Sequence, residues 1–238
     1  INTGIEWALP YFIDNPLVAI PDVGLDYSSF GYNLAGVVLE QALGDTYEAL
    51  VLEQVAQRLG MDTLSADRHW VDLPDRAVGY RYVNGRQVRD GDDDVSWKLP
   101  GGGFISTVVD LARYCGGLSD DILVERAVRD EQLWAPAAAG DTYGLGFNLR
   151  RVGGERLIHH SGRQQKVATD LRLYPDSGLC VVMMTNTTYS NPADLNRRIE
   201  SAWRYPGACA EREPIRRDGS HIQVGLTADG LIATYRSL

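Results

Sequence analysis

The stretch ATDLRLYPDSGLCVVMMT, residues 168–185, decides the fold class because it predicts two strands joined by a tight turn. Residues 168–174 and 179–185 are short, largely apolar runs, and the Asp-Ser-Gly between them is typical of a turn. Short turns join antiparallel neighbours. Two earlier runs, 145–150 and 156–160, extend the pattern, so the sequence predicts an antiparallel meander.

The segments on either side of this meander carry the apolar periodicity of helices. Residues 28–43 place apolar side chains at the i, i+3, i+4 and i+8 positions of one helix face, and Gly44 is a natural end for that helix. Gly116-Gly117 is expected to end another helix that starts near residue 106. Similar patterns predict further helices at 45–59, 120–134 and 192–204.

The order of helices, then an antiparallel meander, then a helix predicts an α+β fold, with helices flanking the sheet. We expect a mainly helical subdomain with loops over residues 1–139. Residues 140–205 then hold the antiparallel strands and the C-terminal helix of the α/β part. The tail, 206–238, is polar and predicts one more hairpin around Asp229-Gly230.

The composition is that of an ordinary globular protein with an acidic balance of charge. Of the 238 residues, 44% are hydrophobic and 23% are charged, and the net charge is −9. This charge argues against nucleic acid as a partner, because such binding depends on neutralising phosphates, and against anionic membrane surfaces. No apolar run approaches the ~20 residues of a membrane span, so we expect no transmembrane segment.

The spacing of cysteine and histidine predicts neither a metal site nor a cofactor. The three cysteines, Cys115, Cys180 and Cys209, include no CxxC pair and describe neither a zinc site nor a disulfide framework. Cys180 lies in an apolar strand pattern, where a thiol is usually inert packing. His69 and His221 stand isolated in the sequence, so we expect no metal and no cofactor.

Two motifs contain the residue types that serine acyl transfer needs, and the first is Tyr27-Ser28-Ser29-Phe30-Gly31-Tyr32 at a helix start. In acyl transfer a neighbouring base must activate the serine, and a tyrosine can carry the proton where cations stabilise its phenolate. Tyr27, just before the first helical turn, is placed for that role. Taken alone, it also fits a packed aromatic side chain, and both interpretations stay open.

The second motif, His160-Ser161-Gly162, closes a predicted strand. A small residue followed by glycine lets a substrate backbone lie along an exposed strand edge, and the N–H of Arg163 is placed to line an oxyanion hole. Taken alone the motif is weak, because any strand can end in a glycine turn. His159 is expected on the opposite side of the sheet, in a structural role.

Two other segments have features of ligand-binding loops. Gly101–Gly103 precedes a helix, as in phosphate-binding loops, but the Gly-Lys-Ser/Thr of a P-loop is absent, which favours a tight structural turn. Asp90–Asp94 is acidic, but it lacks the alternating ligand positions and the distal Glu of an EF-hand loop. A solvated acidic loop is therefore favoured over a calcium site.

Five segments, in order, resemble the serine β-lactamase and penicillin-binding-protein-like family, in its class C-type branch. YSSFGYNLAGVVLEQALG at 27–44 resembles the family's Tyr-x-Asn helix, and WKLPGGGFISTVVDLARY at 97–114 resembles its Gly-Gly-x-x-Ser-Thr-x-x-Asp-Leu helix. RLGMDTL at 58–64, YGLGF at 143–147 with HHSG, and LRLYPDSGLCVVMMTN at 171–186 resemble a turn and the closing strands. These motifs are most similar to those of mitochondrial β-lactamase-like serine proteases and their bacterial relatives.

The resemblance implies a β-lactamase/transpeptidase-like fold and a serine site whose Ser-x-x-Lys nucleophile lies on an upstream helix. It implies that Tyr27 is the proton carrier. His160 stands where the lactamases have the lysine of Lys-Thr-Gly, and it would hydrogen-bond the substrate or tune Tyr27. The resemblance also implies four substrate-binding positions, at Ser29, Ser161, Gly162 and Arg163.

Several residues depart from the family pattern. Ser29 stands where Asn is usual, and Arg163 and Lys166 stand where glycines are common, which narrows and charges the mouth of the site. Such cations fit either a carboxylate-bearing substrate or an exposed basic rim. Neither Lys98 nor Lys166, the only lysines, has a serine three positions before it. We therefore expect this chain to be part of a longer polypeptide, whose N-terminal segment supplies Ser-x-x-Lys.

These observations predict a serine hydrolase that acts through an acyl-enzyme on an ester, amide or peptide bond, in a small-molecule or peptide substrate. A peptidase or esterase fits better than a true β-lactamase, because His160 replaces the lysine. The alternative is a catalytically inactive relative or fragment that acts as a binding or scaffold module, and filament assembly is a third hypothesis. The resemblance implies a periplasmic or secreted location, and the oligomeric state stays open.

Overall fold

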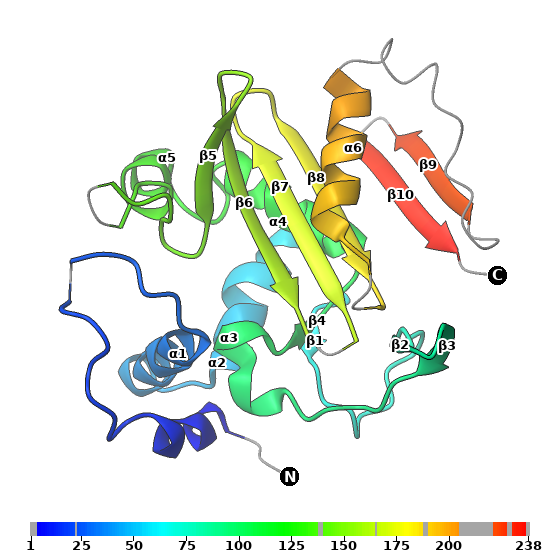
Figure 1. The fold of residues 1–238 in the computed structure, drawn as a ribbon. Helices are drawn as coiled ribbons and strands as arrows, with labels where there is room; N and C mark the ends of the chain where they lie inside the picture. The colour runs from blue at the N-terminus through cyan, green and yellow to red at the C-terminus, as the bar shows by residue number, and fades with distance from the viewer. Residues whose placement is uncertain are drawn as a thin grey trace.

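A four-stranded antiparallel sheet in the order β5-β6-β7-β8 forms the centre of the protein (Figure 1). The strands are β5 (Asn148–Val152), β6 (Glu155–Arg163), β7 (Ala168–Tyr174) and β8 (Leu179–Thr185). The predicted α+β class with an antiparallel sheet is confirmed. The computed structural model describes residues 4–21, 23–137, 140–164, 166–187, 190–204, 221–227 and 230–236.

Helices cover both faces of this sheet. Successive side chains of a strand point to opposite faces, so each strand presents side chains to the helices on both sides. On β8, Cys180 packs into a hydrophobic core beside α4 (Val108–Ser119), whereas Val181 lies on the side of α6 (Pro192–Arg204). Figure 1 shows α6 in front of the sheet and α4 behind it. The core on the α4 side contains the buried residues Cys115, Leu118, Trp134, Phe147, Ile158, Leu171 and Leu173.

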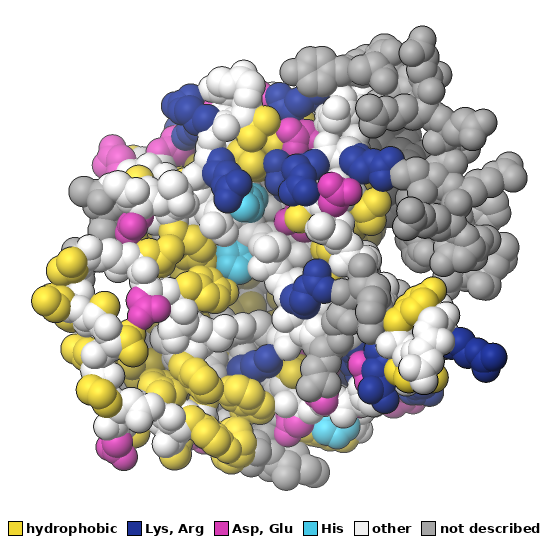
Figure 2. All heavy atoms as spheres, viewed as in Figure 1, with side chains coloured by type: hydrophobic (Ala, Val, Ile, Leu, Met, Phe, Trp, Pro, Cys, Tyr) yellow, Lys and Arg dark blue, Asp and Glu magenta, His cyan; other side chains and the backbone are white. Residues whose placement is uncertain are grey.

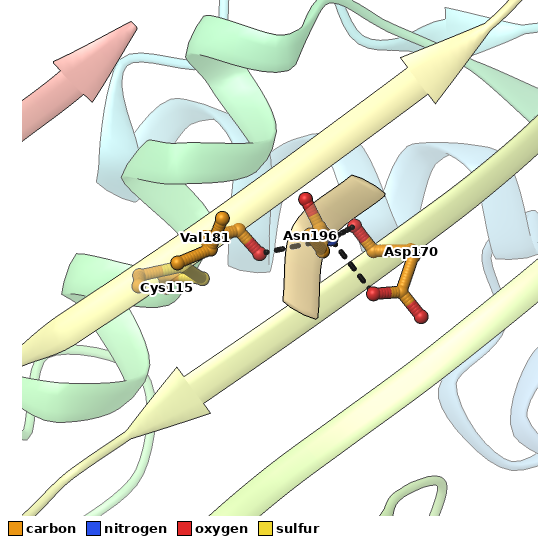
Figure 3. The surroundings of a disulfide bond; sticks show 5 residues. Cys115, Asp170, Val181 and Asn196 are labelled. Carbon is orange, nitrogen blue, oxygen red and sulfur yellow. Dashed lines mark hydrogen bonds between the residues drawn. A yellow bond between two sulfur atoms is a disulfide. The ribbon is translucent and has the colours of Figure 1, made fainter. Parts of the chain in front are cut away.

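Polar side chains hold α6 on its face of the sheet. Arg172 Nε donates to Glu200 Oε2 at 3.0 Å, and both residues are buried. Asn196 Nδ2 donates to the backbone carbonyl of Asp170 at 3.0 Å and to its carboxylate at 2.7 Å (Figure 3). Because removing one partner leaves a buried group unpaired, these contacts restrict α6 to one position on the strands.

A disulfide joins Cys115 of α4 to Cys180 of β8, with their Cα atoms 6.3 Å apart (Figure 3). The prediction that the cysteines describe no disulfide framework is therefore wrong for this pair, and Cys180 is more than inert packing. The two cysteines are 65 positions apart in the sequence, and only the packing of α4 on β8 brings them together. Cys209 lies outside the described residues.

The helix α4 continues through Gly116-Gly117 to Ser119, so the prediction that these glycines end it is wrong. A Cβ on Gly117 would lie 2.3 Å from a methyl carbon of Leu59. The glycine therefore serves close packing, and not helix termination. Side-chain hydrogen bonds tie the start of α4 to Thr63, whose N–H and hydroxyl both donate to the Asp110 carboxylate.

The helix α1 (Ser29–Leu43) begins and ends where its sequence predicts. Ser28 is the N-cap, and its Oγ accepts a hydrogen bond from the Gly31 N–H at 3.1 Å. Gly44 ends the helix in the left-handed conformation, with φ 72°. These two ends fix Tyr27 immediately before the first turn.

A buried asparagine anchors α1 to the glycine-rich segment behind it. Asn33 Oδ1 accepts from the Gly101 N–H at 3.1 Å, and Asn33 Nδ2 donates to the Trp97 carbonyl at 3.4 Å. A Cβ on Gly101 would lie 3.0 Å from the Ser29 carbonyl oxygen, so this close approach requires glycine. Gly101 therefore has a packing role, in agreement with the structural interpretation of Gly101–Gly103.

The remaining elements are short. The strands β9 and β10 pair antiparallel, with Gly230 opposite Thr227, and Asp229 of the predicted turn lies outside the described residues. Within the described ranges, no helix combines the length and the apolar character that crossing a membrane requires. The other elements are η1 (Ile5–Tyr11), α2 (Tyr47–Val51), η2 (Leu52–Gln57), β1 (Ser65–Ala66), β2 (Tyr80–Val83), β3 (Arg86–Arg89), η3 (Ser96–Lys98), α3 (Leu99–Gly102), β4 (Phe104–Ile105), α5 (Arg126–Val128), η4 (Arg129–Leu133), β9 (His221–Thr227) and β10 (Gly230–Arg236).

Removing the disulfide is expected to destabilise the protein by about 4 kcal/mol, because the bond closes a long loop in the unfolded chain. The measurement is urea unfolding of the native protein with and without dithiothreitol, beside a Cys115→Ala/Cys180→Ala double variant. The double variant should be insensitive to the reductant. An equal midpoint for oxidised and reduced native protein would contradict the bond.

Candidate active site

Tyr27 and His160, far apart in the sequence, lie side by side between the start of α1 and β6. Their ring centroids are 6.3 Å apart. Tyr143, which precedes β5, contacts both rings: its centroid lies 5.9 Å from that of Tyr27, edge-on, and 6.1 Å from that of His160. The fold therefore brings the two predicted catalytic residues into one aromatic cluster.

The hydrogen bond of the His160 ring goes to Tyr143, whose hydroxyl lies 3.0 Å from Nε2. Burial lowers the pKa of His160, while an interaction with the Ser161 backbone opposes that effect. The neutral ring has one N–H, so the tautomer of the ring decides whether Nε2 donates to the Tyr143 hydroxyl or accepts from it.

A second tyrosine continues this chain of hydrogen bonds. Tyr32, on the first turn of α1, is hydrogen-bonded through its side chain to Tyr143. Burial raises the pKa of both phenols, so both stay protonated at neutral pH. The network Tyr32–Tyr143–His160 carries no net charge.

Sequence reasoning missed Tyr143 as a member of the site. Its motif, YGLGF, was noted as a closing segment without a role for any residue. The glycines after it shape its turn: Gly146 has φ 89°, and a Cβ on Gly146 would lie 3.6 Å from the Tyr32 hydroxyl oxygen. The sequence signal that points to Tyr143 is an aromatic residue followed by Gly-x-Gly.

The strand β6 extends beyond the end of β5, so residues 160–163 form an open edge of the sheet on the β5 side. Pairing with β5 stops at Asn148↔His159, whereas pairing with β7 continues to Arg163↔Ala168. In the part of the chain that the structure describes, no strand pairs with residues 160–163 on the β5 side. This open edge of β6 can accept an extended substrate by strand addition.

The direction of the backbone amides favours the predicted oxyanion role of Arg163. The N–H of Gln164, directly after β6, donates to the Val167 carbonyl and so points toward β7. Successive N–H groups of an extended strand point to opposite edges. The N–H groups of Arg163 and Ser161 therefore point to the open edge of β6.

The side chains of the predicted substrate-binding residues lie at different places around this edge. Ser29 begins α1, next to Gly101, and Ser161 faces the α6 side because it pairs with Asp170. Gly162 pairs with Thr169, and a Cβ there would lie 3.0 Å from Thr169 Oγ1. Gly162 thus lets the Thr169 side chain lie close to β6.

The two cations expected at the mouth make protein contacts of their own. The Arg163 guanidinium donates to the Ser190 carbonyl at 3.3 Å. Lys166 pairs with Asp92 and donates to the Gly91 carbonyl at 2.9 Å, so it holds the acidic loop of residues 90–94 against the sheet. Across the described ranges, no three His, Cys, Asp or Glu side chains gather to hold a metal ion.

His159 lies on the α6 side of the sheet, opposite Arg172 in the strand register. Burial, with the charges of Arg172 and Arg150, lowers its pKa to about 4. Its Nε2 is buried without a hydrogen-bond partner. These surroundings accommodate a neutral ring, in keeping with the structural role expected for it.

The family model named Beta-lactamase matches residues 10–202. "Unguisins hydrolase ungD'" of Aspergillus campestris is 25% identical over 192 residues, which are 73% of this chain and 35% of the hydrolase. Human "Serine beta-lactamase-like protein LACTB, mitochondrial" is 33% identical over 108 residues, 45% of this chain and 20% of LACTB. The chain thus spans about a third or less of the length of these curated relatives.

Solved structures share the fold at low sequence identity. The octameric penicillin-binding protein homologue of Pyrococcus abyssi aligns with a TM-score of 0.75 and 22% identity, over 84% of this chain and 48% of the homologue. D-amino acid amidase of Ochrobactrum anthropi, solved with D-phenylalanine, aligns with a TM-score of 0.67 and 20% identity, over 83% and 63%. At these identities the likeness shows the fold alone.

Replacing Tyr143 by Phe is expected to shift the pKa of His160, because the hydrogen bond at Nε2 is lost. A rise would show that Tyr143 donates this bond, and an unchanged pKa would contradict the bond. The measurement is an NMR titration of the His160 ring in the native protein and in Tyr143→Phe. Tyr27→Phe is the matched control, since Tyr27 contacts His160 by ring packing. A fall in the His160 pKa in Tyr143→Phe would show that Tyr143 accepts the hydrogen bond.

The folded protein is expected to lose stability as the pH falls from about 6.5 to about 4, because His159 binds a proton more readily when unfolded. The full loss amounts to about 3 kcal/mol from this residue. Urea unfolding at a series of pH values measures it. The pH dependence should be weaker in His159→Gln, and an identical slope in both proteins would rule out this origin.

Proposed function

This chain belongs to the beta-lactamase family, and from that premise we propose that it is part of a serine hydrolase that works through an acyl-enzyme. The bond cleaved is an ester, amide or peptide bond. The observation that carries the proposal is the meeting of Tyr27 and His160 beside the open edge of β6. A proton carrier there faces backbone groups that can hold an extended substrate.

Each residue of the site has a role in this proposal. Tyr27 passes the proton between the nucleophile and the leaving group. The Arg163 N–H binds the developing oxyanion, and Ser161 and Gly162 form the strand edge along which the substrate lies. Ser29, at the start of α1, supplies a hydroxyl contact to the substrate. His160 keeps the aromatic cluster in place through Tyr143.

We propose that the nucleophile lies in a part of the same polypeptide outside residues 1–238, since these residues contain no Ser-x-x-Lys. The exposed apolar side chains near the N-terminus support a covering segment. Figure 2 shows hydrophobic side chains gathered over α1 and the chain that precedes it. Among these exposed residues are Leu17, Val18, Ile20, Val38 and Leu43. Covering apolar surface of this kind is a main source of folding free energy.

The same missing motif favours a second candidate, an inactive relative that binds ligands through the open edge of β6. For the hydrolase, a peptidase or esterase fits better than a β-lactamase, because a neutral His160 replaces the lysine. A periplasmic or secreted location is part of the proposal. The Cys115–Cys180 disulfide supports it, because such bonds persist in oxidising compartments.

Fluorophosphonate labelling of the full-length protein, followed by peptide mapping, tests the proposal. We expect a label on the serine of a Ser-x-x-Lys peptide outside this chain. Tyr27→Phe should lower kcat/KM for hydrolysis of an ester substrate by about 100-fold or more, which is the usual contribution of a proton carrier. His160→Ala should lower it as well, with an unchanged circular dichroism spectrum.

Tyr82→Phe, on β2, is the matched control and should leave kcat/KM unchanged. An unlabelled full-length protein, with no turnover of any ester or amide, would make the binding module the better function. Full labelling together with unchanged kcat/KM in both site variants would remove Tyr27 and His160 from the mechanism.

A further inference from the structure

Lys98 is a partly buried cation at one end of the site. It ends η3, directly before the glycine-rich α3, and its ammonium donates to Gln164 Oε1 at 2.7 Å. The ammonium also lies 5.7 Å from the centre of the Trp97 ring. Gln164 Nε2 in turn donates to the Gly102 carbonyl at 2.8 Å, which fixes the orientation of its amide.

Burial and a nearby carboxylate act on the Lys98 ammonium in opposite directions. Asp93 is close enough to favour the charged form, but burial dominates and lowers the pKa of Lys98. An ammonium has three N–H donors, and the contact with Gln164 uses one. Lys166, the other lysine, differs because Asp92 pairs with it. Lys98 is therefore partly desolvated, and one of its donors is directed to Gln164.

The geometry of β6 places Lys98 at the opposite end of the site from Tyr27. His160, Gly162 and Gln164 are two residues apart, so they line one face of the strand. Four residues of extended chain separate the Cα atoms of His160 and Gln164 by about 13 Å. Tyr27 lies at the His160 end and Lys98 at the Gln164 end. Gly162, between them, carries no side chain.

The direction of the reaction assigns a part of the substrate to each end. A proton carrier must lie beside the leaving group, which places the leaving group at the Tyr27 end. The Arg163 N–H, which would bind the carbonyl oxygen, lies between Gly162 and Gln164. The acyl portion of the substrate then extends past Gln164 toward Lys98.

We propose that Lys98 is a specificity-determining residue that binds a carboxylate on the acyl portion of the substrate. This inference rests on the proposed function for the direction in which the substrate lies. The carboxylate would accept hydrogen bonds from the Lys98 ammonium, with Trp97 and Gln164 holding the ammonium in place. The preferred substrates are esters or amides of a dicarboxylic acyl group.

Two phenyl esters that differ in one group test the proposal in the full-length protein. One is the phenyl ester of N-(4-carboxybenzoyl)glycine, and the other is the corresponding 4-carbamoyl ester. We expect the native protein to prefer the carboxylate through a lower KM. Lys98→Met should raise that KM about tenfold with a similar kcat, the effect of losing a charge-assisted hydrogen bond, and leave the neutral ester unaffected.

Two control variants separate charge from packing. Lys98→Arg keeps the charge and should retain most of the preference, whereas Arg126→Met removes an exposed cation on α5 and should leave both KM values unchanged. An equal change for both esters in Lys98→Met, or no change for either, would overturn the proposal.

A readout without turnover separates this proposal from the proposed function. The two matching glycinamides, which lack the phenyl ester, are titrated into the native protein and Lys98→Met by calorimetry. Tighter binding of the carboxylate that disappears in Lys98→Met supports the site even in a protein that hydrolyses neither ester. Equal affinity for the two amides in the native protein overturns it.

Discussion

The alternation of side chains along β6 is the constraint on which the rest of the structure depends. His160 shares one face with Ile158 and the α4 core, and His159 shares the other with Arg172 and α6. A shift of one residue in register would exchange the two histidines and bury His160 under α6. The core contacts of Ile158 on one face and the Arg172–Glu200 ion pair on the other both oppose that shift. The position of the site is therefore a consequence of how the sheet packs, before any chemistry is considered.

Local patterns predicted β7, β8 and α6, but the helix expected at 120–134 is only α5 and η4, and contacts between distant segments could not be predicted. The bounds of β7, β8 and α6 follow from short apolar runs and turn residues that act within the segment itself. The path of α4 through Gly117 depends on Leu59, and the disulfide depends on α4 packing against β8, so neither appears in local spacing. Tyr27 and His160 were identifiable because their motifs are distinctive. Tyr143 and Lys98 act through partners that only the fold supplies.

A histidine in place of lysine changes the electrostatics at the catalytic end of the site. A lysine would bring a permanent positive charge next to Tyr27 and favour its phenolate. His160 is neutral near neutral pH because burial lowers its pKa, and its Nε2 is occupied by Tyr143. The tyrosines Tyr32 and Tyr143 are also neutral, since burial raises their pKa values. Under the proposed function, the charge that activates Tyr27 must then come from the lysine of the Ser-x-x-Lys motif, when that segment is in place.

The site is positively charged at the Lys98 end and neutral at the Tyr27 end. This difference determines whether a contact with the substrate contributes to substrate selection or to transition-state stabilisation. Under the proposed function, neutral aromatic groups surround the position of the leaving group, and the cation Lys98 stands at the acyl end, on a helix–loop segment anchored through Asn33. A carboxylate held there is remote from the bond that breaks, so its attraction to Lys98 changes little between the ground state and the transition state. Such an interaction selects and positions the substrate without directly stabilising the transition state. Transition-state stabilisation is then left to the Arg163 N–H and Tyr27, whose placement depends on β6 and on the start of α1 and not on Lys98. Selectivity and rate are consequently separable properties of this site, because they arise from residues on different elements of the fold.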